Sequence, residues 1–221
     1  MSTKYAVIIA DIIGSKKMAE MERYEWQLFL KSAIVQVNEN WRNAIEAQFM
    51  ITKGDEFQGD VHDVPNAHSI MIEFERLLNP LQLRFGIGLG RIQKMGANIP
   101  IEMDGPAFHR ANRALNTAKK KKSSVQFYSS DPQLDKYINT LYSLIYAIKG
   151  HWSDIIRSRY WKYKEMGTYD KVADLDGVSP QAVWDSLRNA NAIEVINAEE
   201  TVKEFLREKM LELQDPSESW K

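Results

Sequence analysis

The pattern of hydrophobic positions changes once along the chain, near residue 130. Before that point, short apolar runs typical of strands alternate with stretches whose apolar residues recur at spacings of three and four, typical of amphipathic helices. After it, only the helical spacing remains. The pattern therefore predicts an α+β domain over residues 1–130, followed by an all-α part.

The first part opens with a continuous, β-branched run over 5–13, the pattern of a strand buried on both faces. Two short runs, 49–52 and 57–61, flank a turn with Asp55 and Glu56, which predicts a β-hairpin with these acids near its tip. Further elements are expected as helices over about 26–45, 67–78 and 105–121 and as strands over 81–92 and 124–129. Together they predict an α+β sandwich with helices on one sheet face.

Three glycines share one face of the strand predicted over 81–92. Gly86, Gly88 and Gly90 alternate there with apolar residues, which take the other face. Glycine inside a strand indicates a close approach by another backbone or by a ligand. A strand that is simply kinked is the equally weighted alternative.

The all-α part begins with a helix over 131–150, where a heptad-like spacing of apolar residues suits a connecting or dimerising helix. Shorter helices are expected over 153–166, 169–176, 180–189 and 198–213. The segment 169–187 fits a helix-turn-helix, with Ser179 as the N-cap of its second helix. Residues 151–221 are therefore expected to form a helix-turn-helix domain.

The second helix of this motif would present Gln181, Trp184 and Arg188 to DNA. The objection is charge, because residues 150–221 contain ten Lys or Arg against fourteen Asp or Glu, and a DNA-binding module needs a basic footprint on phosphate. Four nearby cations offer a local footprint: Arg157, Arg159, Lys162 and Lys164. DNA binding is favoured slightly over protein contact through Trp184. The third alternative is a helical bundle that only packs on the first domain.

Composition narrows the class of protein. The chain has 221 residues, 44% of them hydrophobic, a net charge of −1 and no cysteine. The near-neutral charge gives no global attraction to nucleic acid or membrane, and the lack of cysteine excludes disulfides, thiolate zinc sites and cysteine nucleophiles. The N-terminus lacks the regions of a signal peptide, and no apolar run reaches the length of a membrane span, so a cytoplasmic protein without membrane contact is expected.

Two carboxylates stand where packing alone does not require them. Asp11 closes the first apolar run, and Asp55 lies at the hairpin tip. An unpaired buried carboxylate is costly, and two such residues on adjacent strands make a hard-oxygen site for Mg²⁺ or Mn²⁺. Taken alone, each has a plainer explanation, Asp11 as a helix cap and Asp55 as an ordinary turn acid.

Four blocks, in order, resemble the catalytic domain of class III nucleotidyl cyclases and the related GGDEF domains. They are residues 10–15 (ADIIGS), 53–57 (KGDEF), 84–90 (RFGIGLG) and 105–113 (GPAFHRANR). The resemblance covers about residues 5–130, and the whole chain looks closest to the SatD family. It implies a ferredoxin-like, cyclase-type sheet, a nucleoside triphosphate as ligand, and a site shared between the two chains of a homodimer.

The resemblance also assigns the metal-binding half of this site. Asp11 and Asp55 would hold two Mg²⁺ ions, with the backbone carbonyl of Ile12 as a further ligand. The backbone N–H groups of Gly14 and Ser15 would cradle phosphate.

The other half of the site departs from the cyclase pattern. Arg113 matches the arginine that stabilises transition-state charge, and Glu102 falls near the base-reading acid. However, His109 stands where cyclases have an Asn that orients the ribose, and Ile51 stands where they have a base-reading Lys. The altered half fits nucleotide binding better than efficient cyclisation. The lysine run 119–122 is expected to offset a helix macrodipole, with triphosphate contact as the lesser alternative.

Three functions stay open from the sequence. The first is a regulator, in which a Mg-nucleotide bound to the first domain biases a helix-turn-helix module that contacts DNA or protein. The second is an active nucleotidyl cyclase or nucleotidyltransferase with two metal ions, in which Arg113 and His109 are catalytic. The third is a structural adaptor with a catalytically dead site.

Overall fold

The computed structural model describes residues 5–94 and 103–212, which belong to two compact units. Unit 1 takes in the chain up to Tyr142 and again from Val202, and unit 2 comprises Ser143 to Thr201. Helices α4 (Pro132–Lys149) and α8 (Ala192–Glu212) contribute residues to both units. The division into residues 1–130, 131–150 and 151–221 stays a prediction.

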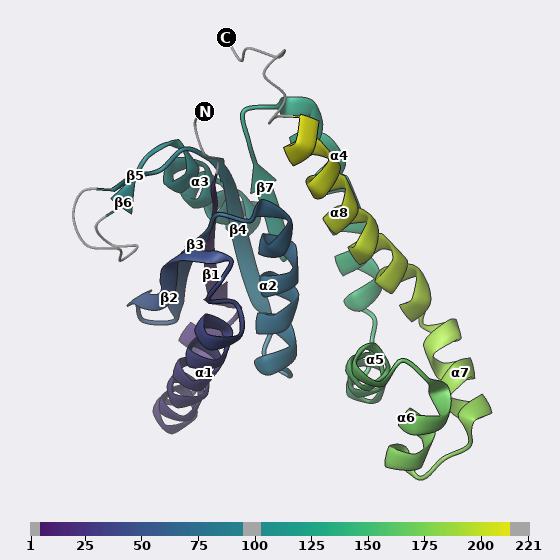
Figure 1. Ribbon diagram of the computed structural model, residues 1–221. Coiled ribbons are helices and arrows are strands. Elements are labelled where there is room, and N and C mark those ends of the chain that lie inside the picture. The colour runs from purple at the N-terminus through teal and green to yellow at the C-terminus, as the bar shows by residue number, and fades with distance from the viewer. Residues whose placement is uncertain (1–4, 95–102, 213–221) are drawn as a thin grey trace. The chain divides into compact units, whose positions relative to one another are not determined.

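Unit 1 is built on a five-stranded mixed sheet with the strand order β2-β3-β1-β4-β7 (Figure 1). Its elements are β1 (Tyr5–Ile12), η1 (Ser15–Lys17), α1 (Glu20–Asn40), β2 (Ile45–Lys53), β3 (Glu56–Val61), α2 (Val64–Leu77), β4 (Leu83–Gly90), α3 (Pro106–Lys121) and β7 (Val125–Tyr128). A separate two-stranded sheet joins β5 (Gln93–Lys94) and β6 (Met103–Asp104). From β1 to β4 the elements follow the β-α-β-β-α-β order of a ferredoxin-like motif, and the predicted α+β architecture is confirmed.

Strand β1 is central because its side chains are apolar on both faces. It pairs antiparallel with β3 on one side and with β4 on the other, and every residue from Ala6 to Ile12 is buried. Strand β7 pairs parallel to β4 at one edge of the sheet. The residue that closes β1 on this buried sheet is therefore held in a fixed position.

Helix α3 lies directly on the glycine face of β4. A Cβ atom added to Gly88 would lie 2.1 Å from the carbonyl oxygen of Ala107, and one added to Gly86 would lie 2.3 Å from the amide nitrogen of Leu115. Only residues without a side chain leave room for a helix backbone at this distance. The expected close approach is thus confirmed, and the approaching backbone belongs to α3.

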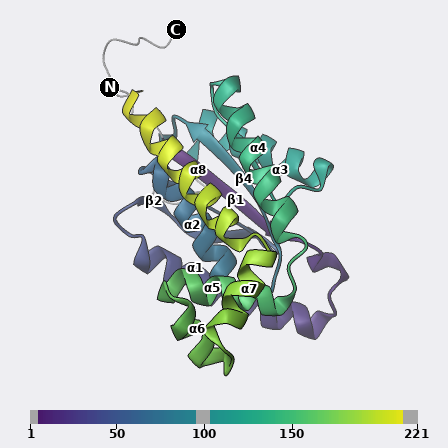
Figure 2. The same ribbon diagram turned by 90° about the vertical axis from the view of Figure 1, so that its right-hand side faces the viewer.

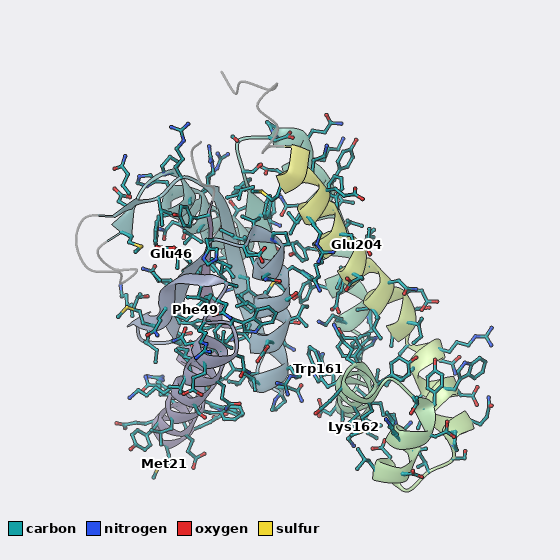
Figure 3. The ribbon with its side chains drawn as sticks, viewed as in Figure 1. Met21, Glu46, Phe49, Trp161, Lys162 and Glu204 are labelled. Atoms are coloured by element: carbon teal, nitrogen blue, oxygen red, sulfur yellow. The ribbon has the colours of Figure 1, made fainter. Side chains whose placement is uncertain are left out.

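Helices cover both faces of the sheet, so the expectation of helices on one face only is wrong. In unit 1, Phe74 of α2 packs on Phe57 of β3 with ring centroids 4.8 Å apart, and on Phe49 of β2, labelled in Figure 3, at 5.0 Å. Phe57 lies opposite Ala10 of β1, whereas α3 packs with Val7 and neighbouring odd-numbered residues of that strand. Because successive side chains of a strand alternate in direction, α2 and α3 lie on opposite faces.

An asparagine side chain binds the backbone of each edge strand. Asn38 of α1 accepts from the Phe49 N–H of β2 at 2.8 Å and donates to the carbonyl of the same residue at 2.9 Å. Asn139 of α4 makes the same pair of bonds with Phe127 of β7, at 2.7 and 2.8 Å. These amides take up backbone groups that an edge strand would otherwise present to another chain.

Unit 2 is helical. It contains α5 (Asp154–Met166), α6 (Tyr169–Asp176) and α7 (Pro180–Asn189), which lie together in both views (Figures 1 and 2), as well as parts of α4 and α8. The predicted bounds of α4 to α7 are confirmed within one or two residues. Helix α8 begins earlier than the predicted residue 198, because only the left-handed residue Asn191 (φ 52°) and the C-cap Ala190 separate it from α7.

A buried ion network holds unit 2 together. The carboxylate of Glu199, which is 2% exposed, accepts from the Tyr160 hydroxyl and from Lys164 at 2.6 Å each and pairs with Lys149 at 3.4 Å. The ring of Trp161, labelled in Figure 3, lies 5.4 Å from the Lys149 nitrogen. Burial acts to raise the pKa of Glu199, but these two lysines and the tyrosine hydroxyl lower this pKa below its ordinary value. Glu199 is therefore charged at neutral pH.

No helix among residues 5–94 and 103–212 is long and apolar enough to span a bilayer.

We expect Gly88→Ala to lower the free energy of unfolding by about 2–3 kcal/mol, because the new methyl group must push α3 away from the sheet. Urea unfolding followed by circular dichroism measures this change. Gln48→Ala, at an exposed position of β2, is the control and should change stability by no more than about 0.5 kcal/mol. Equal stability of Gly88→Ala and wild type would contradict the contact between α3 and β4.

Candidate functional site

Asp11 lies at the end of the central strand, 7% exposed, with a cationic side chain on each of its oxygens. Arg84, directly opposite on β4, places Nη1 3.2 Å from Oδ1, and Lys119 of α3 places Nζ 2.9 Å from Oδ2. Burial acts to lower the pKa of Lys119, but its hydrogen bonds to Asp11 and Glu56 and their negative charges raise this pKa above its ordinary value. Asp11 is therefore a buried carboxylate with two cationic partners, one from β4 and one from α3.

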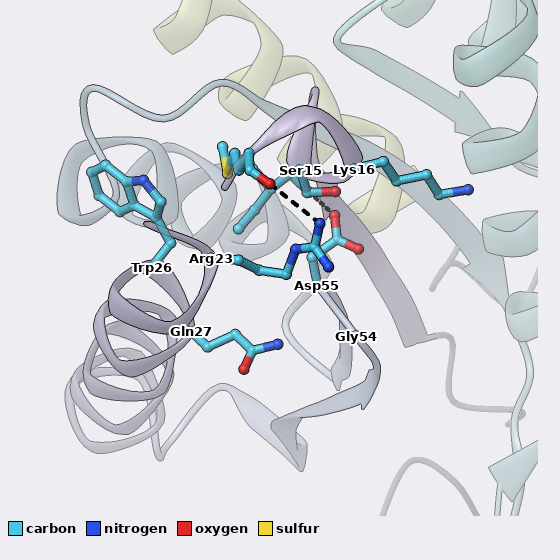
Figure 4. A pocket seen from close by; sticks show the side chains of 9 residues that line it. Ser15, Lys16, Arg23, Trp26, Gln27, Gly54 and Asp55 are labelled. Carbon is cyan, nitrogen blue, oxygen red and sulfur yellow. Dashed lines mark hydrogen bonds between the residues drawn. The ribbon is translucent and has the colours of Figure 1, made fainter. Parts of the chain in front are cut away.

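The β2–β3 hairpin brings two further acids to this end of β1. Gly54 takes a positive φ of 63°, and this left-handed conformation turns the chain tightly between the paired residues Lys53 and Glu56. The turn aims Asp55 at β1, where its Oδ2 accepts from the Ile12 N–H at 3.1 Å (Figure 4). The carboxylate of Glu56 lies 3.5 Å from the Lys119 nitrogen.

The predicted metal ligands are thus brought together at one strand end. The carboxylates of Asp11 and Asp55 and the Ile12 carbonyl are all oxygen donors, the chemistry that Mg²⁺ and Mn²⁺ prefer. Among the residues that the structure describes, no group of three or more His, Asp and Glu side chains is arranged to hold a metal. The predicted set, with two carboxylates and one backbone carbonyl, fits a metal that keeps part of its water shell.

A cavity of about 140 Å³ opens beside Asp55, between the β2–β3 turn and the start of α1. Figure 4 shows that Ser15, Lys16, Arg23 and Trp26 line it. The cavity therefore offers an aromatic ring and two basic side chains next to the Asp55 carboxylate. Of the two predicted phosphate-binding residues, Ser15 lines this cavity and Gly14 immediately precedes η1. Glu102, predicted to read the base, lies outside the described residues.

His109 and Arg113 are not brought to this site within one chain. Both lie on α3, and at 1.5 Å per residue His109 is about 15 Å and Arg113 about 9 Å along the helix axis from Lys119. The His109 ring lies 3.3 Å from Asp104, and the Arg113 guanidinium lies 4.7 Å from the centre of the Tyr128 ring. A role for these two residues at Asp11 therefore requires a second chain.

On α7, the three predicted DNA-contacting residues share one surface. The guanidinium of Arg188 covers the Trp184 ring at 4.7 Å from its centre, and Gln181 donates to Asp185 at 3.3 Å. Arg188 and Gln181 are exposed, and Trp184 is half-buried. This arrangement makes an aromatic platform capped by one cation.

Three of the four cations predicted as a phosphate footprint are bound to acids of unit 2. Arg159 and Lys162 both contact Asp176, the former at 2.8 Å, and Lys164 contacts Glu199. Contacts to phosphate would require these ion pairs to open. The helices predicted for a helix-turn-helix are present, whereas DNA binding through them stays a prediction.

Sequence reasoning missed that Arg84 and Lys119 belong to the acidic site. A signal was available, because Lys119 extends the i, i+4 row of Ala107, Ala111 and Leu115 that packs on the glycine face. Arg84 likewise falls on the same strand face as Gly86. The assignment of the lysine run to the helix macrodipole overlooked this row.

Residues 5–206 match the model of the SatD family, and the chain belongs to that family. None of the curated proteins is significantly similar to it.

Several solved structures of cyclase catalytic domains are similar to part of the chain. The guanylate cyclase domain of RhGC from Catenaria anguillulae in complex with GTP is 15% identical, with 52% of this chain and 74% of that one covered and a TM-score of 0.42. A dimeric guanylyl cyclase domain from Blastocladiella emersonii is 14% identical, with 52% of this chain and 74% of that one covered and a TM-score of 0.42. The adenylyl cyclase CyaB from P. aeruginosa is 18% identical, with 55% of this chain and 82% of that one covered and a TM-score of 0.38.

The ion pairs of Asp176 make a pH-dependent contribution to stability. The bonds from Lys162 and Arg159 lower the pKa of Asp176, so this contribution is present above the ordinary Asp value of about 3.9 and is lost as the pH falls through the lowered value. We expect Asp176→Asn to cost about 1–2 kcal/mol at pH 7 and progressively less below pH ~4. Urea midpoints across this range measure the difference, with Asp174→Asn, at an exposed position of the same helix, as the control. A difference that did not change with pH would contradict the assignment.

Proposed function

We propose that unit 1 binds a nucleoside triphosphate together with Mg²⁺ or Mn²⁺ at the Asp11 end of β1, and that this binding regulates the contacts of unit 2. The observation that carries the proposal is that Asp11 and Asp55 both lie at the end of β1, with a cavity lined by basic side chains on the Asp55 side. The Asp11 carboxylate is buried, and a buried charge is costly to keep unless it is paired.

Each residue of the site has a chemical task in this proposal. Asp11, Asp55 and the Ile12 carbonyl would hold the metal, which when bound neutralises phosphate charge. Lys16 and Arg23 line the cavity next to Asp55 and would contact the phosphates, together with the backbone at Gly14 and Ser15. Trp26 offers an apolar ring at the same cavity.

Turnover as a nucleotidyl cyclase is the second candidate function. The separation of Arg113 and His109 from Asp11 along α3 favours a homodimer, in which these residues would act on a nucleotide held by the metal site of the other chain. Arg113 would then balance charge that develops on the phosphates. Pyrophosphate release is the property that separates this enzyme from a nucleotide-binding regulator.

For unit 2, we propose a protein rather than DNA as the partner. The cations beside α6 are engaged by Asp176 and Glu199, which leaves little of the basic footprint that phosphate requires. The pair formed by Trp184 and Arg188 suits a protein interface, where these two residue types often carry much of the binding energy.

The nucleotide site can be tested by thermal unfolding with each nucleoside triphosphate, with and without Mg²⁺ or Mn²⁺. Because a ligand that binds only the folded state stabilises it by about 2.7 kcal/mol at a hundredfold excess over Kd, we expect the midpoint to rise by about 5–10 °C with one nucleotide and metal. Asp55→Asn should abolish the shift. Asp63→Asn, an exposed acid just beyond β3, should keep it.

Absence of any nucleotide-dependent shift in the wild type would refute the proposal and favour the structural adaptor. A shift accompanied by pyrophosphate release would favour the enzyme instead. A mixture of Asp55→Asn and Arg113→Ala chains would then recover activity. In the mixed dimer, one of the two shared sites combines the intact Asp55 of one chain with the intact Arg113 of the other.

DNA binding by unit 2 can be tested by fluorescence anisotropy with the full chain and labelled duplexes of varied sequence. At about 50 mM salt, where phosphate contacts are strongest, we expect no binding stronger than about 10⁻⁵ M, with or without nucleotide. Nanomolar binding that weakened in Arg188→Ala on α7, but not in Arg207→Ala on α8, would restore DNA as the partner.

A further inference from the structure

The cation that binds Asp11 from α3 occupies the place where a metal would have to bind. Lys119 Nζ lies 2.9 Å from Asp11 Oδ2, and a metal ligated by this oxygen would lie about 2.0–2.6 Å from it. A divalent ion and an ammonium held on the same carboxylate oxygen repel each other, so the two compete for Asp11. We propose that Lys119 is a built-in competitor of the metal, and that metal binding at Asp11 is coupled to release of the Lys119 side chain. This inference rests on the proposed function.

Of the two cations on Asp11, Lys119 is the one that can leave. Arg84 lies within the sheet opposite Asp11, and its side chain is 16% exposed. The Lys119 side chain is 39% exposed, stands near the end of α3, and ends in a compact ammonium on a flexible stem. Lys119 can therefore swing into water without disturbing the sheet.

The charges of the site make this exchange possible. Asp11, Asp55 and Glu56 carry three negative charges, against two positive charges on Arg84 and Lys119. With Lys119 bound, the buried carboxylate is satisfied in the absence of metal. When a divalent ion binds, Lys119 can give up Asp11 and keep Glu56, which lies 3.5 Å away.

The position of Lys119 follows from the packing of α3, which makes its role specific. Lys119 lies one further step along the row of Ala107, Ala111 and Leu115 that contacts the sheet. Its neighbour Lys120 carries the same charge but, one residue further on, points about 100° away around the helix. The chain thus provides a matched control within the same lysine run.

The experiment measures Mn²⁺ affinity of the full chain without nucleotide, by the loss of the electron paramagnetic resonance signal of the free ion. We expect Lys119→Met to bind Mn²⁺ roughly three- to fivefold more tightly than wild type, the effect of removing one partly exposed ion pair. Lys120→Met removes the same charge and should leave the affinity within about twofold of wild type. Lys119→Arg restores the cation and should return the affinity to the wild-type level or below.

A second readout is the unfolding midpoint with and without Mn²⁺. Without metal, Lys119→Met should unfold at a lower temperature than wild type, because the charge of Asp11 loses a partner, and saturating Mn²⁺ should reduce this difference. Wild type and Lys119→Met binding Mn²⁺ equally would overturn the inference and leave the proposed function intact. No Mn²⁺ binding by any variant without nucleotide would also overturn the inference, whereas the proposed function is decided separately by the unfolding shift of the wild type with nucleotide and metal.

Discussion

The buried charge of Asp11 is the constraint on which the site in unit 1 depends. A carboxylate that is 7% exposed at the end of a central strand must be matched by positive charge, or the sheet around it loses stability. Arg84 and Lys119 supply this charge from two different elements. Asp55 supplies no positive charge, but its hydrogen bond from the Ile12 amide holds a second carboxylate at the same end of β1. The result is a compact acidic site with its own counter-ions, which a divalent cation could replace in part.

The fold and the site are linked through the glycine face of β4. Because Gly86 and Gly88 have no side chains, α3 approaches the sheet until its backbone contacts the strand. This approach sets the direction of the row of small residues on α3 and carries Lys119 to Asp11 at the far end of the helix. A change in the packing of α3 would therefore move the cation on Asp11. The same helix carries Arg113 at a distance from Asp11, which makes a second chain necessary for any joint action of the two.

Much of the fold followed from periodicity, because long runs of apolar residues at spacings of two or of three and four are local signals. The two carboxylates of the site were predicted for the same reason, since each interrupts or closes such a run. The second helical face was missed because β1 is apolar on both sides and does not indicate how many layers cover it. The role of Lys119 was missed because a basic residue near a helix end has a local explanation that hides a long-range one. The start of α8 was placed too late because Asn191 breaks the helical pattern for a single residue.

The most direct test of the central claim is a crystal structure of the full chain with Mn²⁺ and a non-hydrolysable nucleoside triphosphate, with anomalous scattering to locate the metal. The account predicts an anomalous peak between the carboxylates of Asp11 and Asp55, phosphates beside Lys16 and Arg23, and the Lys119 ammonium away from Asp11. Lys119 still bound to Asp11, with no metal between the two carboxylates in the presence of bound nucleotide, would contradict it.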